Sequence, residues 1–116
     1  MSKHQVILCI VNSGFTDEAM DAAKQCGARG GTVFHARGTV SKEAEKFFNI
    51  TVQPEKEIVM ILVDEKIKDN ILKALYNAVG TNTPAQGIAF SLPVDDVVGI
   101  GKELPKIEEK KEIKKK

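Results

Sequence analysis

Few side chains in this sequence have the type and the spacing that catalysis or metal binding requires. A nucleophile needs a base and a group that orients the base, but nothing in the sequence brings Ser91, His35 and Asp95 together as such a set. Cys9 and Cys26 belong to no CxxC motif and to no Cys/His pair with zinc spacing, so we expect reduced packing residues. The sequence therefore predicts a protein that is not an enzyme, has no metal site and requires no cofactor.

The composition predicts one small domain without a nucleic-acid partner. The chain has 116 residues and a hydrophobic content of 42%, which suffices for one modest core. Its 17 Lys and Arg against 16 Asp and Glu give a net charge of +1, so no basic excess favours nucleic acid. The apolar run from Val6 to Val11 is far shorter than the ~20 residues that span a bilayer, and no signal peptide precedes it. We expect a cytoplasmic location.

The elements that would position any site can be read from hydrophobic patterning. Apolar, β-branched runs predict strands, and apolar residues at helical spacing that end at glycine predict helices. We expect Ser13 or Thr16 to cap the first helix and Asp64 to cap the second. The expected strands are Gln5–Val11, Gly31–Arg37, Glu57–Val63 and Ile88–Leu92, the last ended by Pro93, and the expected helices run from Thr16 to Cys26 and from Asp64 to Gly80.

This β-α-β-β-α-β order predicts an α+β protein with a ferredoxin-like antiparallel sheet and both helices on one face. The first and third strands are apolar on both sides: Val6 and Leu8 alternate with Ile7 and Cys9, for example. Two helices cannot cover both faces, and monomers seldom expose so large an apolar surface. We therefore expect self-association; the alternative is that the long loop or the tail covers the second face.

Two segments lack a sustained apolar period. Residues 39–56 form a predicted long loop, and loops of that length usually carry function or are disordered. We expect this loop to be mobile and deletion of its tip to spare folding. Residues 104–116 are so highly charged that we expect a flexible tail beyond a domain that spans residues 1–103.

Three stretches together resemble the PII family of signal-transduction proteins. They are Gly30-Gly-Thr-Val-Phe-His-Ala-Arg-Gly38, Glu57-Ile-Val-Met-Ile-Leu-Val63 and Gly87-Ile-Ala-Phe-Ser-Leu-Pro-Val-Asp-Asp96, and the similarity spans about Gln5 to Ile100. The resemblance implies a nitrogen-regulatory signalling protein that forms a homotrimer and binds adenine nucleotides in three clefts. It also implies a mobile loop, here residues 39–56, that engages a target protein such as a membrane transporter or an enzyme.

The resemblance also implies the nucleotide-binding positions. Around the second strand and the base of the long loop they are Thr32, Arg37 and Gly38, and in the loop that would cradle phosphate they are Thr81, Thr83, Ala85, Gln86 and Gly87. Backbone amides of the second group could bind phosphate. We expect Gly87 to need a close approach and a positive φ, so that Gly87→Val would block the ligand and spare the fold.

The sequence departs from the family pattern at three cationic positions. The phosphate-binding lysine of the family is Ile88 here, and two arginines fall on Gly99 and Gly101. Arg29, Arg37 or Lys102 could supply replacement charge. The loss of these cations weakens the binding of ATP and ADP more than that of AMP. We therefore expect ATP to bind no more than about tenfold more tightly than AMP. Because Tyr76 is the only tyrosine, tyrosine uridylylation of the long loop is not expected.

Two other functional classes stay open at this stage. One is a trimeric metal-binding protein of the copper-tolerance type, which has a similar fold; Cys9, Cys26, His4 and His35 show no shared ligand spacing for it. The other is a structural interaction domain without a small ligand. A metal titration and a screen of ATP, ADP, AMP and cyclic AMP would separate the three.

Overall fold

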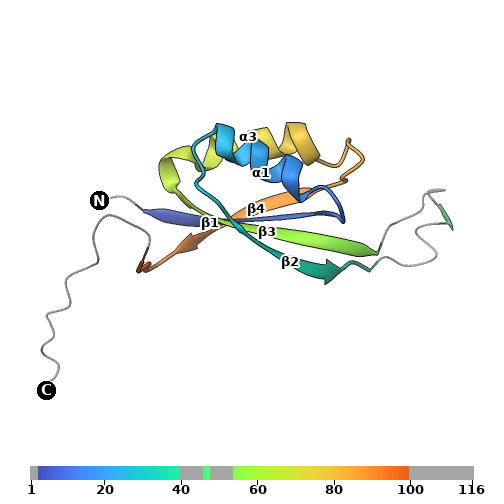
Figure 1. The fold of residues 1–116 in the computed structure, drawn as a ribbon, viewed down its shortest axis with the longest axis horizontal. Helices are drawn as coiled ribbons and strands as arrows, with labels where there is room; N and C mark the ends of the chain where they lie inside the picture. The colour runs from blue at the N-terminus through green and yellow to red at the C-terminus, as the bar shows by residue number, and fades with distance from the viewer. Residues whose placement is uncertain (1–2, 40–45, 48–53, 100–116) are drawn as a thin grey trace, which may run out of the picture.

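A computed structural model of the chain describes residues 3–39, 46–47 and 54–99. The elements occur in the predicted order, and the four-stranded sheet has the strand order β2-β3-β1-β4 with antiparallel neighbours throughout (Figure 1). This is the predicted α+β, ferredoxin-like architecture. The elements are β1 (His4–Asn12), α1 (Thr16–Gln25), β2 (Thr32–Arg37), β3 (Glu55–Asp64), α3 (Glu65–Val79) and β4 (Ile88–Val94).

Helices α1 and α3 cover one face of the sheet, and the core lies between the two layers (Figure 1). Alternate residues of β1 and β3 point to this side because successive side chains of a strand face opposite ways. Small residues of α1 allow it to approach the sheet closely, and α3 contributes the aliphatic stripe that its spacing predicted. The buried side chains include Ile7, Cys9 and Val11 of β1, Ala19 and Ala23 of α1, Val59, Ile61 and Val63 of β3, and Ile71, Leu75 and Val79 of α3.

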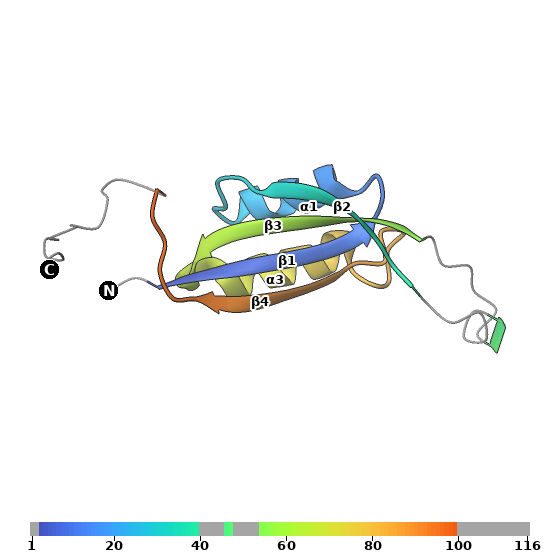
Figure 2. The same ribbon diagram turned by 90° about the horizontal axis from the view of Figure 1, so that it is seen from below.

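The second face of the sheet carries no helix among the described residues, and Figure 2 views it directly. Cross-strand pairing aligns its apolar side chains in rows. Leu8 of β1 lies between Met60 of β3 and Phe90 of β4, and Ile10 lies between Ile58 and Ile88. Phe34, Phe90, Leu92 and Ile88 are 41–56% exposed on this face. We call it the open face; it is the two-sided apolar pattern predicted from β1 and β3.

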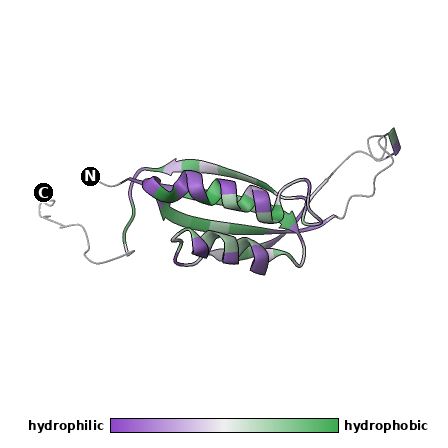
Figure 3. Ribbon diagram, turned by 90° about the horizontal axis from the view of Figure 1, so that it is seen from above, coloured by the Kyte–Doolittle hydropathy of each residue, from purple (hydrophilic) through white to green (hydrophobic). Residues whose placement is uncertain are grey.

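Seen from the helix side, α1 and α3 carry hydrophilic residues interspersed with hydrophobic ones (Figure 3). Asp64 caps α3 as predicted, and its carboxylate accepts a hydrogen bond from the amide of Lys66 at 2.9 Å. The expected cap of α1 is wrong: Phe15 occupies the N-cap position and no side chain caps the helix there. None of the described helices is long and apolar enough to cross a membrane.

Two strand boundaries differ from the prediction by two residues, and the other shifts are of a single residue. β3 begins at Glu55, inside the predicted long loop, because Glu55 and Lys56 pair with the end of β2 beyond the apolar part of the strand. β4 continues through Pro93 to Val94, since β4 is an edge strand and proline can be accommodated where one side of the backbone has no partner. Most of the predicted long loop and the tail at 104–116 lie outside the described residues, so their mobility stays a prediction.

Candidate ligand site at one end of the sheet

The candidate site lies where β1 ends, β2 ends and β3 begins. At this end of the sheet Asn12 of β1 pairs with Lys56 of β3, and Lys56 pairs with Ala36 of β2. Residues 81–87, which connect α3 to β4, return to the same place, because the amide of Asn12 donates to the carbonyl of Ala85 at 2.9 Å. The topology therefore brings the base of the long loop and the connection 81–87 to one location in a single chain.

The connection 81–87 is held by its own hydrogen bonds. The hydroxyl of Thr83 donates to the Gly80 carbonyl at 2.8 Å and accepts from the amide of Ala85 at 3.2 Å. The amide of Gln86 donates to the Thr83 carbonyl at 3.0 Å, and that of Gly87 donates to the Val79 carbonyl at 2.7 Å. The amides of Ala85, Gln86 and Gly87 thus already donate hydrogen bonds within the chain.

Gly87 is required for packing. It is buried, a Cβ on it would overlap the carbonyl oxygen of Val79, and the same Cβ would lie 3.0 Å from Cγ1 of Val11. The residue with a positive φ is the neighbouring Gln86, at 49°. Two expectations are therefore corrected: Gly87 needs no positive φ, and Gly87→Val would disturb the fold. Ala85 is likewise a core residue, at 1% exposure.

Lys56 and Asn12 are functional candidates that the sequence analysis missed. The ammonium of Lys56 donates to Oδ1 of Asn12 at 2.6 Å. Nδ2 of Asn12 donates to the carbonyl of Pro84 at 3.0 Å and lies 3.4 Å from Oε1 of Gln86. The side-chain amide of Asn12 thus bridges the ammonium of Lys56, near the start of β3, and residues 81–87.

Gly38 joins the same cluster from the base of the long loop. Its amide donates to the carbonyl of Pro54 at 2.8 Å, which closes the base, and a Cβ on Gly38 would lie 2.9 Å from Cε of Lys56. A side chain at this position would displace Lys56. The lysine stem therefore lies against the glycine backbone while its ammonium contacts Asn12.

The other predicted positions are distributed differently. Thr81 is exposed at the start of the connection. Arg37 pairs with Glu55, on the opposite side of the β2 strand from Ala36. Thr32 pairs with Met60, four residues before Ala36, which is about 13 Å at ~3.3 Å per residue. The structure therefore brings Gly38, Gln86 and the backbone of residues 83–87 together in one chain, but not Thr32. Of the expected replacement cations, Lys102 lies outside the described residues.

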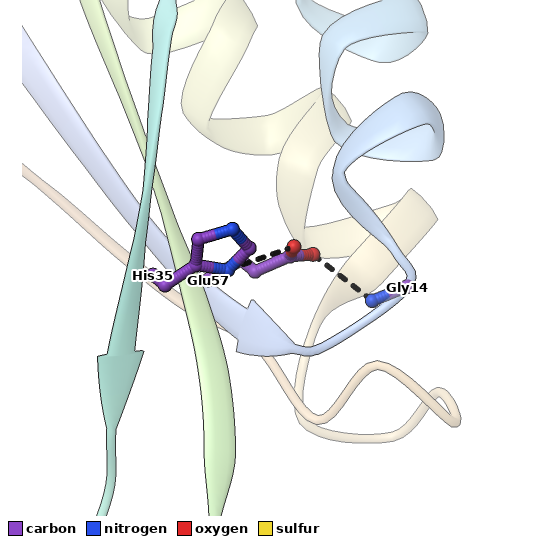
Figure 4. A network of polar contacts seen from close by, with 3 residues as sticks. All are labelled: Gly14, His35 and Glu57. Carbon is purple, nitrogen blue, oxygen red and sulfur yellow. Dashed lines mark hydrogen bonds and ion pairs between the residues drawn. The ribbon is translucent and has the colours of Figure 1, made fainter.

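Glu57 anchors the turn after β1 next to this site (Figure 4). One carboxylate oxygen accepts from the amide of Gly14 at 3.0 Å, and the other lies 3.5 Å from Nδ1 of His35. Because the His35 side chain is 86% exposed, the ion pair contributes little, whereas the bond to Gly14 fixes a turn with φ of 101°. Among the described residues no three His, Cys, Asp or Glu side chains gather as metal ligands would.

An apolar cavity of about 270 Å³ lies beside the connection, between α3 and β4. Tyr76, Thr81 and Ile88 are exposed around it, and core residues form its floor. Among these is Cys9, and burial raises the pKa of the Cys9 thiol to about 11. The thiol is therefore protonated at neutral pH and is not a nucleophile there.

The sequence matches the family model of Nitrogen regulatory protein P-II over residues 4–103. The match covers most of the chain, and the protein belongs to the P-II family. A comparison with curated proteins found no match.

Solved structures support the same fold. Arabidopsis thaliana PII bound to citrate is 24% identical with a TM-score of 0.64, covering 86% of this chain and 82% of that chain. A PII-like signalling protein from Thermus thermophilus is 21% identical with a TM-score of 0.58, covering 79% and 86%. B. subtilis GlnK is 11% identical with a TM-score of 0.63, covering 84% and 90%. The fold is that of a PII signalling protein, as the sequence resemblance predicted.

Proposed function

We propose that this protein is a homotrimeric cytoplasmic regulator that binds an adenine nucleotide in clefts between its subunits and acts on a target protein, a transporter or an enzyme, through residues 39–56. It has no catalytic activity of its own. The observation that carries the proposal is the cluster of Lys56, Asn12, Gly38 and Gln86. Within one chain this cluster connects the base of the long loop to the connection 81–87. A ligand bound there would contact both segments.

Lys56 supplies the positive charge of this site. It stands beside the connection 81–87, whereas Ile88 and Gly99 occupy positions that are cationic in the resemblance. One ammonium can pair with one phosphate, which AMP already carries, so added phosphates gain little. We therefore expect ATP to bind no more than about tenfold more tightly than AMP, a difference of ~1.4 kcal/mol.

The open face supports a location between subunits. Its exposed apolar rows favour burial against other copies. We propose a closed ring of three copies in which the Thr32 end of one sheet lies against the Gly38 end of another. In that arrangement Thr32 would join the ligand site from the neighbouring subunit. This accounts for the distance between Thr32 and the cluster within a single chain.

Isothermal titration calorimetry with AMP, ADP, ATP, cyclic AMP and citrate tests the proposal. Citrate is included because the Arabidopsis protein was crystallised with it. Lys56→Gln should weaken AMP binding by about tenfold or more, since it removes a charge-assisted contact. The matched control is Lys73→Gln, on the exposed side of α3. If the wild-type protein binds none of these nucleotides, the proposed function is wrong; if Lys73→Gln weakens AMP as much as Lys56→Gln does, the site is misplaced.

A further inference from the structure

Asn12 is the only buried polar side chain among the described residues, at 6% exposure. Burying an amide costs free energy unless its donors and its acceptor all find partners. Nδ2 has the carbonyl of Pro84 and Oε1 of Gln86, and Oδ1 has the ammonium of Lys56. The opposite amide orientation would place Nδ2 against the ammonium and Oδ1 against two acceptors. The partners therefore fix the orientation with the oxygen toward Lys56.

Lys56 has no carboxylate within ion-pair distance among the described residues. Its sequence neighbours are both glutamates, but strand alternation turns Glu55 and Glu57 to the other side of β3. Glu57 is occupied there by the amide of Gly14 and by His35. The ammonium contacts a neutral oxygen, so its positive charge is not cancelled.

We propose that Asn12 is a positioning residue that sets the charge of the anion site. Its neutral amide holds the Lys56 ammonium beside the connection 81–87 without neutralising it, and the other end of the same amide fixes that connection. The inference rests on the proposed function and names its specificity: the site selects a ligand with one phosphate over the same ligand without phosphate. An aspartate at position 12 would occupy nearly the same volume but would pair with Lys56 and consume the charge.

The ratio of AMP affinity to adenosine affinity reports this role. In the wild-type protein AMP should bind at least tenfold more tightly than adenosine, because only AMP carries the anion. In Asn12→Asp the ratio should fall to within about threefold of unity while adenosine affinity stays within about threefold of wild type. Lys56→Gln should give the same collapse. A purely structural role of Asn12 would instead lower both affinities by the same factor and leave the ratio unchanged, which would overturn the inference.

A second variant covers the case in which Asn12→Asp does not fold, since its second oxygen would face the carbonyl of Pro84. Asn12→Ala leaves Lys56 charged but releases it, so the ratio should fall a few-fold, less than in Lys56→Gln. An unchanged ratio in Asn12→Ala would overturn the positioning role. Circular dichroism and thermal unfolding of each variant show whether the fold is retained.

Pyrophosphate, titrated by calorimetry, separates failure of this inference from failure of the proposed function. If nucleotides do not bind but pyrophosphate binds to wild type and is lost in Asn12→Asp, the nucleotide function is wrong and the anion site stands. If nucleotides bind with an AMP preference that persists in Asn12→Asp, the function stands and the inference is wrong. If wild type binds neither pyrophosphate nor AMP, both are wrong.

Discussion

At the scale of single residues, the thiol of Cys9 links the core to pH. Cys9 is 1% exposed, and burial raises its pKa from 9.0 to about 11. Between these values the unfolded chain loses the thiol proton and the native chain keeps it, so the unfolded state binds fewer protons and stability falls as pH rises. The contribution is fully present below pH 9 and is lost by about pH 11. We expect Cys9 to account for a loss of roughly 2–3 kcal/mol across this range.

Urea unfolding at pH 8 and pH 11 measures this loss, with Cys9→Ala as the matched variant. The substitution lowers stability at both pH values, but it also removes the ionisable thiol. Between pH 8 and pH 11 the variant should therefore lose roughly 2–3 kcal/mol less stability than the wild-type protein. Groups that ionise in both proteins cancel in the comparison. Equal losses in the two proteins would show that the Cys9 thiol is not protected by the fold.

The residues of the candidate site could be predicted only in part. Gly38 and the connection 81–87 were found through the family resemblance, which depends on short sequence stretches. Asn12 and Lys56 were not found, because their contacts join residues separated by 44 and 74 positions and depend on strand register. The alternation of Glu55, Lys56 and Glu57 in the sequence carries a usable signal once β3 is known to begin at Glu55. It indicates a lysine on a different side from the two acids.

At the scale of elements, Gly87 determines how the connection 81–87 packs on the end of α3. A Cβ at this position would overlap the Val79 carbonyl, which is backbone and cannot rotate away, so Gly87→Ala should destabilise the protein by roughly 1–3 kcal/mol. The control is Gly30→Ala, because a Cβ on Gly30 would have nothing within 4 Å. Urea unfolding gives both values. If the two substitutions cost the same, the close contact between Gly87 and Val79 is not present in solution.

The start of α3 offers a second prediction at this scale. The carboxylate of Asp64 satisfies an amide of the first turn, so Asp64→Ala should cost about 1 kcal/mol, whereas Asp64→Asn should cost much less because asparagine caps helices comparably. Asp69→Ala is the control, since its carboxylate is 86% exposed in a pair with Lys68. Thermal unfolding distinguishes the three variants. An Asp69→Ala cost as large as that of Asp64→Ala would argue against a capping role.

Elements with strong local patterns were predicted well, and those that depend on neighbours were not. The stripe of Ile71, Leu75 and Val79 and the glycine that follows define α3 from the sequence alone. The polar start of β3 and the passage of β4 through Pro93 depend on which strands lie beside them, and local composition does not carry that information.

At the scale of the whole molecule, the described part of a single chain covers one face of the sheet but leaves the other largely uncovered. One face is buried under α1 and α3, while the open face retains large, partly exposed apolar side chains. Phe34, Phe90 and Leu92 are 41–46% exposed there, although they stand in rows with residues of the central strands. The proposed ligand site lies at one end of this same sheet. Oligomerisation through the open face and completion of the site are therefore expected to be coupled.

This expectation gives the prediction for assembly. Light scattering should report three times the chain mass of 12.7 kDa. Leu8 lies at the centre of the open face, between Met60 and Phe90, so Leu8→Glu should place a charge inside the interface and yield monomers with an intact helix-side core. Lys73→Glu, on the exposed side of α3, is the control and should remain trimeric. A wild-type dimer would contradict the threefold arrangement but keep the burial argument, and a wild-type monomer at micromolar concentration would contradict both.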